Sequence, residues 1–175
     1  MAITYDKIAT VTVTGATAAN IEFTSIPQTY TNLLLKVSLR DSRTDNPITD
    51  TLLTFNNSVS GYSVRGIYSD SSTSGILSSS GAAFIAGTYE TTSQSGNPSA
   101  FSNSEYYMPN YTSSDSKSVS VDGVTEKNTS TNIYMSLLSG LWANSSAITS
   151  IKLAPMFSLL FVTNSTATLY GIKNS

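Results

Sequence analysis

The sequence of 175 residues has no cysteine and no histidine, two residue types that carry much of protein chemistry. Without cysteine there is no disulfide framework, no thiolate metal site and no cysteine nucleophile. Without histidine there is no serine–histidine–aspartate triad, no imidazole-bound metal and no general base whose ordinary pKa lies near neutrality. We therefore expect a non-enzymatic protein without a cofactor or bound metal. Carboxylate-only chemistry, as in glycoside hydrolysis, is the one catalytic class left open.

Charged side chains are also scarce: 9 are basic and 11 are acidic, which gives a net charge of −2. No lysine or arginine lies between Arg65 and Lys117. Phosphate binding requires clustered basic residues, so nucleic acid is not an expected partner. No apolar run approaches the roughly 18 to 20 residues that a membrane-spanning helix needs. We expect no membrane association.

Serine and threonine make up about a third of the chain, a composition typical of proteins outside the cell. The N-terminal residues nevertheless show no charged-then-apolar secretory leader. A protein that assembles into a particle in the host cytoplasm and is released by lysis accounts for both observations. This composition therefore favours a virion component exposed on the exterior of the particle.

Alternation of apolar and polar residues with a period of two is the dominant pattern in the sequence. It is clearest in Leu33–Arg40, where Leu33, Leu35, Val37 and Leu39 share one face. About ten short strands without a helical stripe indicate an all-β, single-domain antiparallel β-sandwich or barrel. The expected strands are Ile8–Thr14, Leu33–Arg40, Ile48–Phe55, Tyr62–Tyr68, Ala82–Tyr89, Phe101–Met108, Ser116–Val121, Asn132–Leu138, Ala147–Leu153, Phe157–Thr163 and Ala167–Ile172.

Two serine-rich stretches, Ser69–Ser80 and Tyr89–Ser99, are expected to be loops. The chain divides into an N-terminal strand or docking arm, residues 1–15, and a β-sandwich domain, residues 16–175. In the first of these, Ile3, Tyr5 and Lys7 are the candidates for contacts with a capsid. The single tryptophan, Trp142, is expected to plug the core or anchor an interface.

Tyrosine is abundant in the middle third of the chain. Amphipathic aromatic rings beside small polar residues suit sugars and protein partners, but they are also ordinary residues of a sheet face. Both interpretations stay open at this point. The candidates for contacts with a partner or a glycan are Tyr62, Tyr106, Tyr107 and Tyr111.

The acidic residues offer two weaker candidates for chemistry. Calcium prefers carboxylate ligands such as those of Asp41, Asp45 and Asp50, but the spacing of these residues is not that of an EF-hand loop. A solvated loop whose charge is neutralised by nearby arginines is the simpler interpretation. Glu105 precedes two tyrosines and is the nearest candidate for a glycosidase acid. A charge on a strand edge is the simpler interpretation there.

Several segments, in their order and spacing, resemble a widespread group of small virion structural proteins of tailed bacteriophages. The resemblance covers most of the chain and is weakest in the serine-rich middle. It is carried by Ile21–Leu33 running into the strand that ends at Arg40, Leu53–Asn57 with Gly61–Ser63, Trp142–Leu153, and Ala167–Lys173.

This resemblance implies a jelly-roll-like β-sandwich on the surface of a phage particle. On the head it would be a capsid decoration (cement) protein that binds the major capsid protein and stabilises the assembled shell. The family resemblance also implies self-association as a homotrimer. The alternative is a tail-associated or fibre module that binds a glycan of the host surface.

Overall fold

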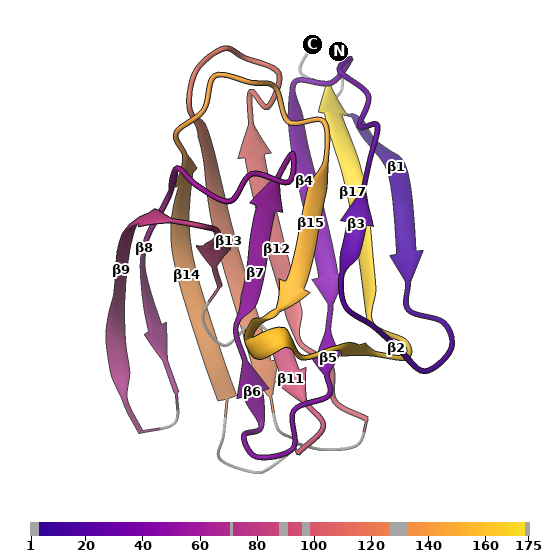
Figure 1. Cartoon of the computed structure of the whole chain (residues 1–175), viewed down its shortest axis with the longest axis vertical. Coiled ribbons are helices and arrows are strands. Elements are labelled where there is room, and N and C mark those ends of the chain that lie inside the picture. The colour runs from indigo at the N-terminus through magenta and orange to yellow at the C-terminus, as the bar shows by residue number, and fades with distance from the viewer. Residues whose placement is uncertain (1–3, 71, 88–90, 96–98, 127–132, 174–175) are drawn as a thin grey trace.

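The computed structural model describes residues 4–70, 72–87, 91–95, 99–126 and 133–173, which form two packed layers of β-sheet (Figure 1). The larger layer is an eight-stranded antiparallel sheet in the order β1-β17-β4-β12-β13-β14-β8-β9. Its strands are β1 (Thr4–Thr12), β17 (Thr166–Lys173), β4 (Asn32–Ser38), β12 (Asn103–Pro109), β13 (Lys117–Glu126), β14 (Ile133–Trp142), β8 (Tyr62–Ser69) and β9 (Ser74–Ala82).

The second layer is a four-stranded sheet in the order β10-β7-β15-β3, which lies in front of the large sheet in Figure 1. Its strands are β10 (Ile85–Ala86), β7 (Thr51–Phe55), β15 (Ile151–Pro155) and β3 (Ile21–Phe23). Short strands close one end of the molecule in the order β2-β16-β5-β11-β6. These are β2 (Thr17–Ala18), β16 (Phe161–Val162), β5 (Arg40–Asp41), β11 (Thr91–Ser93) and β6 (Ile48–Thr49).

The core lies between the two layers and consists of alternate residues of their strands. Leu33 and Leu35 of β4 point inward and are fully buried, as are Leu53 and Phe55 of β7 and Leu153 of β15. Burying alternate apolar residues of facing sheets is the arrangement of a β-sandwich. The expected all-β antiparallel sandwich is confirmed. The finer expectation of a jelly-roll connectivity is not established by this strand order.

The predicted loop at Ser69–Ser80 is wrong over most of its length, because β9 begins at Ser74. This strand pairs antiparallel with β8, from Ser69 opposite Ser74 to Tyr62 opposite Ala82. Pairing with a neighbouring strand here overrides the turn preference of serine and glycine.

Three predicted strands are shorter than expected. Within the segment Ala82–Tyr89, Ala82 ends β9 and only Ile85–Ala86 form the separate strand β10, and residues 88–89 lie outside the described ranges. The segment Ala147–Leu153 becomes a strand only at Ile151. The segment Phe157–Thr163 contains a 3-10 turn, Met156–Ser158, before the two residues of β16. No helix in the described part of the chain is long and apolar enough to cross a membrane.

Candidate interaction surface

Three of the four tyrosines proposed as surface contacts lie in the core. Tyr62 and Tyr111 are 0% exposed, and Tyr106 is 1% exposed. Their rings are therefore not available to a glycan or a partner, which corrects the expectation for these three. Tyr107 follows Tyr106 in β12 and points to the opposite face, where it is 37% exposed. Successive side chains of a β-strand point to opposite faces of the sheet.

The buried tyrosines have structural roles. Tyr62 stacks on Trp142 with ring centroids 6.1 Å apart and an angle of 15° between the planes. The Phe55 N–H donates to the Tyr62 hydroxyl oxygen at 2.8 Å, and burial raises the pKa of this hydroxyl. The Tyr111 hydroxyl donates to the Pro27 carbonyl. The interpretation of Trp142 as a core plug is confirmed, since it is 1% exposed.

The segment proposed as a docking arm is an edge strand over its described residues. Tyr5 and Lys7 lie in β1, opposite Ile172 and Tyr170 of β17. Pairing of this kind leaves no free arm between Thr4 and Thr12. Ile3, the third residue proposed for the arm, lies outside the described residues.

The acidic residues do not converge on a metal site. Asp41 is fully buried, which corrects the interpretation of a solvated loop, whereas Asp45 is exposed and pairs with Arg43 at 2.9 Å. The described residues contain no group of three or more histidine, cysteine or acidic side chains placed to hold a metal ion. Glu105 lies on an open sheet face and pairs with Lys36 at 2.5 Å, and this hydrogen bond raises the pKa of Lys36.

Exposed apolar side chains gather on the outer face of the large sheet, the face turned away from the core. β14 runs along the middle of this cluster, and its residues alternate strictly between exposed and buried. We call the cluster the apolar face. Its members are Ile67, Ile76, Val124, Ile133, Met135, Leu137 and Leu141, each between 39% and 80% exposed.

Cross-strand register joins most of the apolar face, while Leu141 lies apart between Ser118 and Ser63. Leu137 of β14 lies opposite Ile67 of β8, and Ile67 lies opposite Ile76 of β9. Met135 lies opposite Val124 of β13. Four strands spaced about 4.8 Å apart and about nine residues long have a footprint of roughly 600 Å². The seven apolar side chains share this footprint with serines, Asp122 and Arg65.

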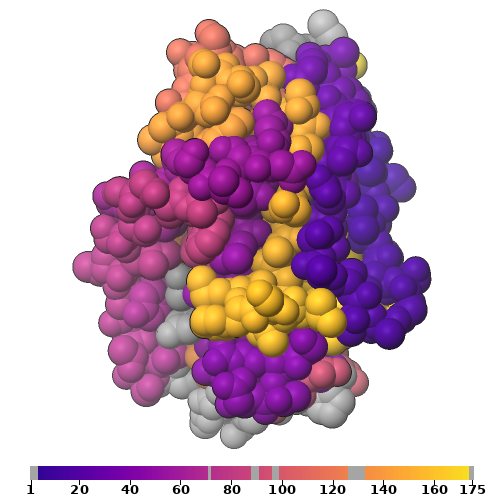
Figure 2. Space-filling model, viewed as in Figure 1, coloured from indigo at the N-terminus to yellow at the C-terminus, as the bar shows by residue number. Residues whose placement is uncertain are grey.

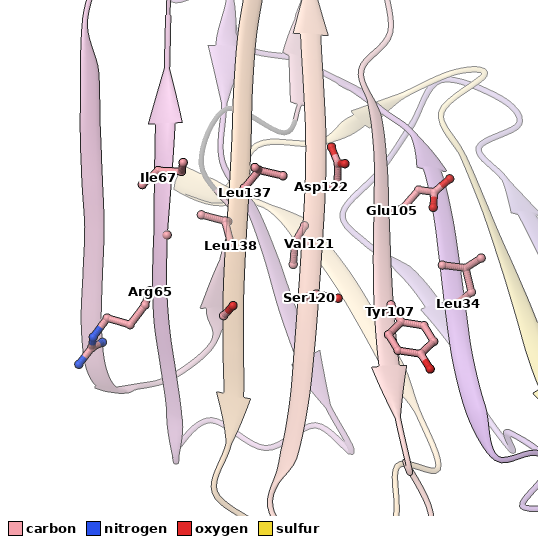
Figure 3. Close-up of a pocket in the computed structure, with 12 residues that line it drawn as sticks. Leu34, Arg65, Ile67, Glu105, Tyr107, Ser120, Val121, Asp122, Leu137 and Leu138 are labelled. Atoms are coloured by element: carbon pink, nitrogen blue, oxygen red, sulfur yellow. The ribbon is translucent and has the colours of Figure 1, made fainter.

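The apolar face borders an open hollow of about 640 Å³ (Figure 3). Cross-strand register places two small residues, Ser120 and Ser139, side by side at its floor, between Tyr107 on one side and Arg65 on the other. Figure 3 shows Arg65 and Tyr107 at opposite sides of the hollow. Asp122 lies on the same face and adds a carboxylate.

Sequence reasoning missed the apolar face because β14 is apolar on both sides. Its sequence places Tyr134 and Leu138 inward and Met135 and Leu137 outward, so no polar alternation marks the strand. The available signal was the number of apolar residues between Ile133 and Trp142. A strand that buries one face needs fewer apolar residues than this segment contains.

Comparisons with known proteins give no relative for this chain: no family model, curated protein or solved structure matches it. The resemblance to phage virion proteins therefore depends on the quoted segments alone.

Proposed function

We propose that this chain is a structural protein of a tailed-phage virion, a decoration protein that binds the major capsid protein on the exterior of the assembled head. The apolar face is the observation that carries this proposal. The four strands that carry it offer a footprint of roughly 600 Å², polar residues included, which approaches the 800 Å² or so that each partner contributes to a standard interface. If the protein is bound to a particle, the particle surface covers this apolar face after assembly.

Composition and site chemistry support a binding role over a catalytic one. The hollow beside the apolar face is open, and its Glu105 carboxylate already pairs with Lys36. An acid that protonates a leaving group needs a raised pKa, which an apolar enclosure provides and an exposed ion pair does not. Apolar contact with a repeated shell lattice requires no cofactor and no catalytic pair.

The first test is the copy number of this chain in purified particles, measured by quantitative mass spectrometry against the major capsid protein. Head decoration predicts a high copy number in simple ratio to the shell lattice. A copy number orders of magnitude lower would contradict decoration and move the chain to the tail or fibre. Absence from particles would overturn the virion assignment.

The second test asks whether the apolar face is the docking surface. Ile67→Ser with Leu137→Ser removes two of its side chains without changing charge, and we expect at least about a tenfold loss of affinity for undecorated heads. The matched control is Val59→Ser with Leu160→Ser, two exposed apolar residues outside this face. Equal affinity of both double variants would contradict the docking surface.

A glycan-binding tail or fibre module is the second candidate, because the hollow combines an aromatic ring with polar groups. Tyr107 provides a half-exposed ring for the apolar face of a sugar, and Asp122 provides a carboxylate for its hydroxyls. Binding to host-surface glycans should be lost in Tyr107→Ala and kept in Tyr5→Ala, an exposed tyrosine at the other edge of the sheet. Equal binding by both variants would contradict this site.

A further inference from the structure

The two edges of the large sheet differ in how they are protected. β1 carries Asp6 and Lys7 and has an irregularity in register between Lys7 and Ala9. Charges and bulges on an edge strand prevent pairing with another chain. β9, at the other edge, has nine residues and contains no charged residue and no proline. In Figure 1 it is the outermost strand, and no described strand pairs with its outer side.

The β8–β9 hairpin shows which backbone groups of β9 point outward. The Asp70 N–H donates to the Thr73 carbonyl at 2.8 Å, so this pair lies between the strands as a hydrogen-bonded pair. Hydrogen-bonded and non-hydrogen-bonded pairs alternate along an antiparallel ladder. By this alternation Ser74, Ile76, Ser78 and Ser80 direct their N–H and C=O groups away from β8. These groups form a template for another strand.

We propose that this free edge of β9 pairs with β9 of a second copy of the chain. The two strands run antiparallel about a two-fold axis near Ser78, which gives the longest overlap of Ser74–Ala82 with itself. Ile76 of each copy then lies beside Ser80 of the other. The two large sheets become one continuous sheet, and the apolar faces of the two copies adjoin.

A second copy suits this edge because two β9 strands can pair without bringing like charges together. Like charges opposite each other destabilise a strand pair, and β9 has none. The nearest charge is Arg65 on β8, whose guanidinium donates to the Ser79 carbonyl and to the Ser80 hydroxyl. In the pair, Ser80 of one copy lies opposite Ile76 of the other, so the two guanidinium groups beside Ser80 are offset by four residues along the strands, roughly 13 Å, which is beyond the Debye length at physiological salt.

The two-fold arrangement also closes the assembly. Each copy uses the β9 edge of its large sheet, and the charged, irregular β1 edges stay outermost. The result is a dimer, rather than the trimer that the family resemblance implies or an open fibre. This inference does not depend on the proposed function, because it concerns the isolated protein.

Sedimentation of the full chain over a range of concentrations tests the dimer. We expect the wild type to be dimeric and Ser78→Pro to be a monomer that still melts cooperatively, without the rise of melting temperature with concentration that a dimer shows. Proline removes an N–H that points outward and leaves the ladder to β8 intact. Ser78→Ala keeps that N–H and should remain dimeric. A monomeric or trimeric wild type, or a Ser78→Pro dimer, would overturn the proposal.

The absence of cysteine allows a second, independent test by single-cysteine cross-linking. Residues opposite each other in a hydrogen-bonded pair have Cα atoms about 5.5 Å apart, within the range for a disulfide. Ser78→Cys should form a covalent dimer under mild oxidation at least about tenfold more than Ser120→Cys, an exposed serine of the same face. Equal cross-linking of the two variants would contradict an axis near Ser78.

Discussion

At the scale of single residues, the aromatic cluster of Phe55, Tyr62 and Trp142 ties the two sheets together. Tyr62 and Trp142 belong to the large sheet and Phe55 to the small one, and the Phe55 and Trp142 ring centroids are 5.6 Å apart. The Tyr62 hydroxyl adds a polar link, since it accepts a hydrogen bond from the Phe55 backbone. Buried aromatic pairs and satisfied buried hydroxyls each contribute on the order of 1 kcal/mol.

Removing that hydroxyl should destabilise the fold. Tyr62→Phe leaves the ring in place but removes the acceptor of the Phe55 N–H, and we expect a loss of about 1–3 kcal/mol in the free energy of unfolding. Urea denaturation followed by tryptophan fluorescence measures it. Tyr107→Phe, on the outer face, should change stability by less than about 0.5 kcal/mol. Equal losses in both variants would contradict the structural role of Tyr62.

The buried carboxyl of Asp41 should make stability depend on pH in an unusual direction. Burial raises the pKa of Asp41, although the hydrogen bond from the Arg43 backbone N–H lowers it in part. A folded-state pKa above the unfolded value means that the folded state binds the proton more tightly. Stability from this group is therefore gained as pH falls from neutrality through the raised pKa, and lost as pH rises.

The stability of the wild type relative to Asp41→Asn should thus improve between about pH 7 and about pH 4.5. Urea midpoints of both proteins at the two pH values measure the change. Asp45→Asn provides the control, because the hydrogen bond from Arg43 lowers the pKa of Asp45, so this carboxyl stays ionised at both pH values and the stability difference should not change between them. If the wild type instead becomes less stable relative to Asp41→Asn as the pH falls, this prediction is contradicted.

Single residues also show what the sequence does not predict, which is the face of a strand that becomes buried. Tyr106 and Tyr107 are neighbours with the same propensity, yet one is buried and the other exposed. The alternation of a strand predicts that they face opposite ways, but only the position of the second sheet decides which face is inside. Tyr62 and Tyr111 were misassigned for the same reason. Their partners, Trp142 and Pro27, are distant in sequence.

At the scale of elements, the interior strands and the edge strands of the large sheet have different importance. β17 lies between β1 and β4 and pairs with both. Its inward residues Ala167 and Leu169 are fully buried. β1 pairs on one side only. The sequence predicted the strand at Ala167–Ile172 well, because its alternation is complete, and it missed β9 because serine and glycine hide a strand that pairing creates.

Deleting residues 167–175 should therefore abolish cooperative folding, since β1 and β4 lose their shared neighbour and the core loses two residues. Thermal melting by circular dichroism tests this. Deleting residues 1–7 is the matched edge truncation: among the described residues it removes the pairing of Thr4 to Lys7, and the protein should still melt cooperatively at a lower temperature. A soluble, cooperatively melting protein without residues 167–175 would contradict the central role of β17.

At the scale of the whole molecule, two sheets of unequal width explain why one face of the large sheet stays open. In Figure 1 the small sheet covers the middle of the large one, while β8 and β9 extend beyond it; Figure 2 shows the same strands along the left side of the molecule. The small sheet thus buries the middle of one face of the large sheet. The other face carries the apolar residues, with Arg65, Asp122 and the Lys36–Glu105 ion pair around the hollow.

A docking surface of this composition predicts how particle binding responds to salt. Apolar contacts are not screened, so the affinity of the protein for undecorated heads should change by less than about twofold between about 0.1 M and about 1 M NaCl. Sulfate at the same ionic strength should strengthen binding, because it is excluded from protein surfaces and favours apolar burial. Co-sedimentation of the protein with heads across both salt series measures this. If docking instead used the 9 basic or 11 acidic side chains, affinity would fall steeply with NaCl and the apolar face would not be the contact.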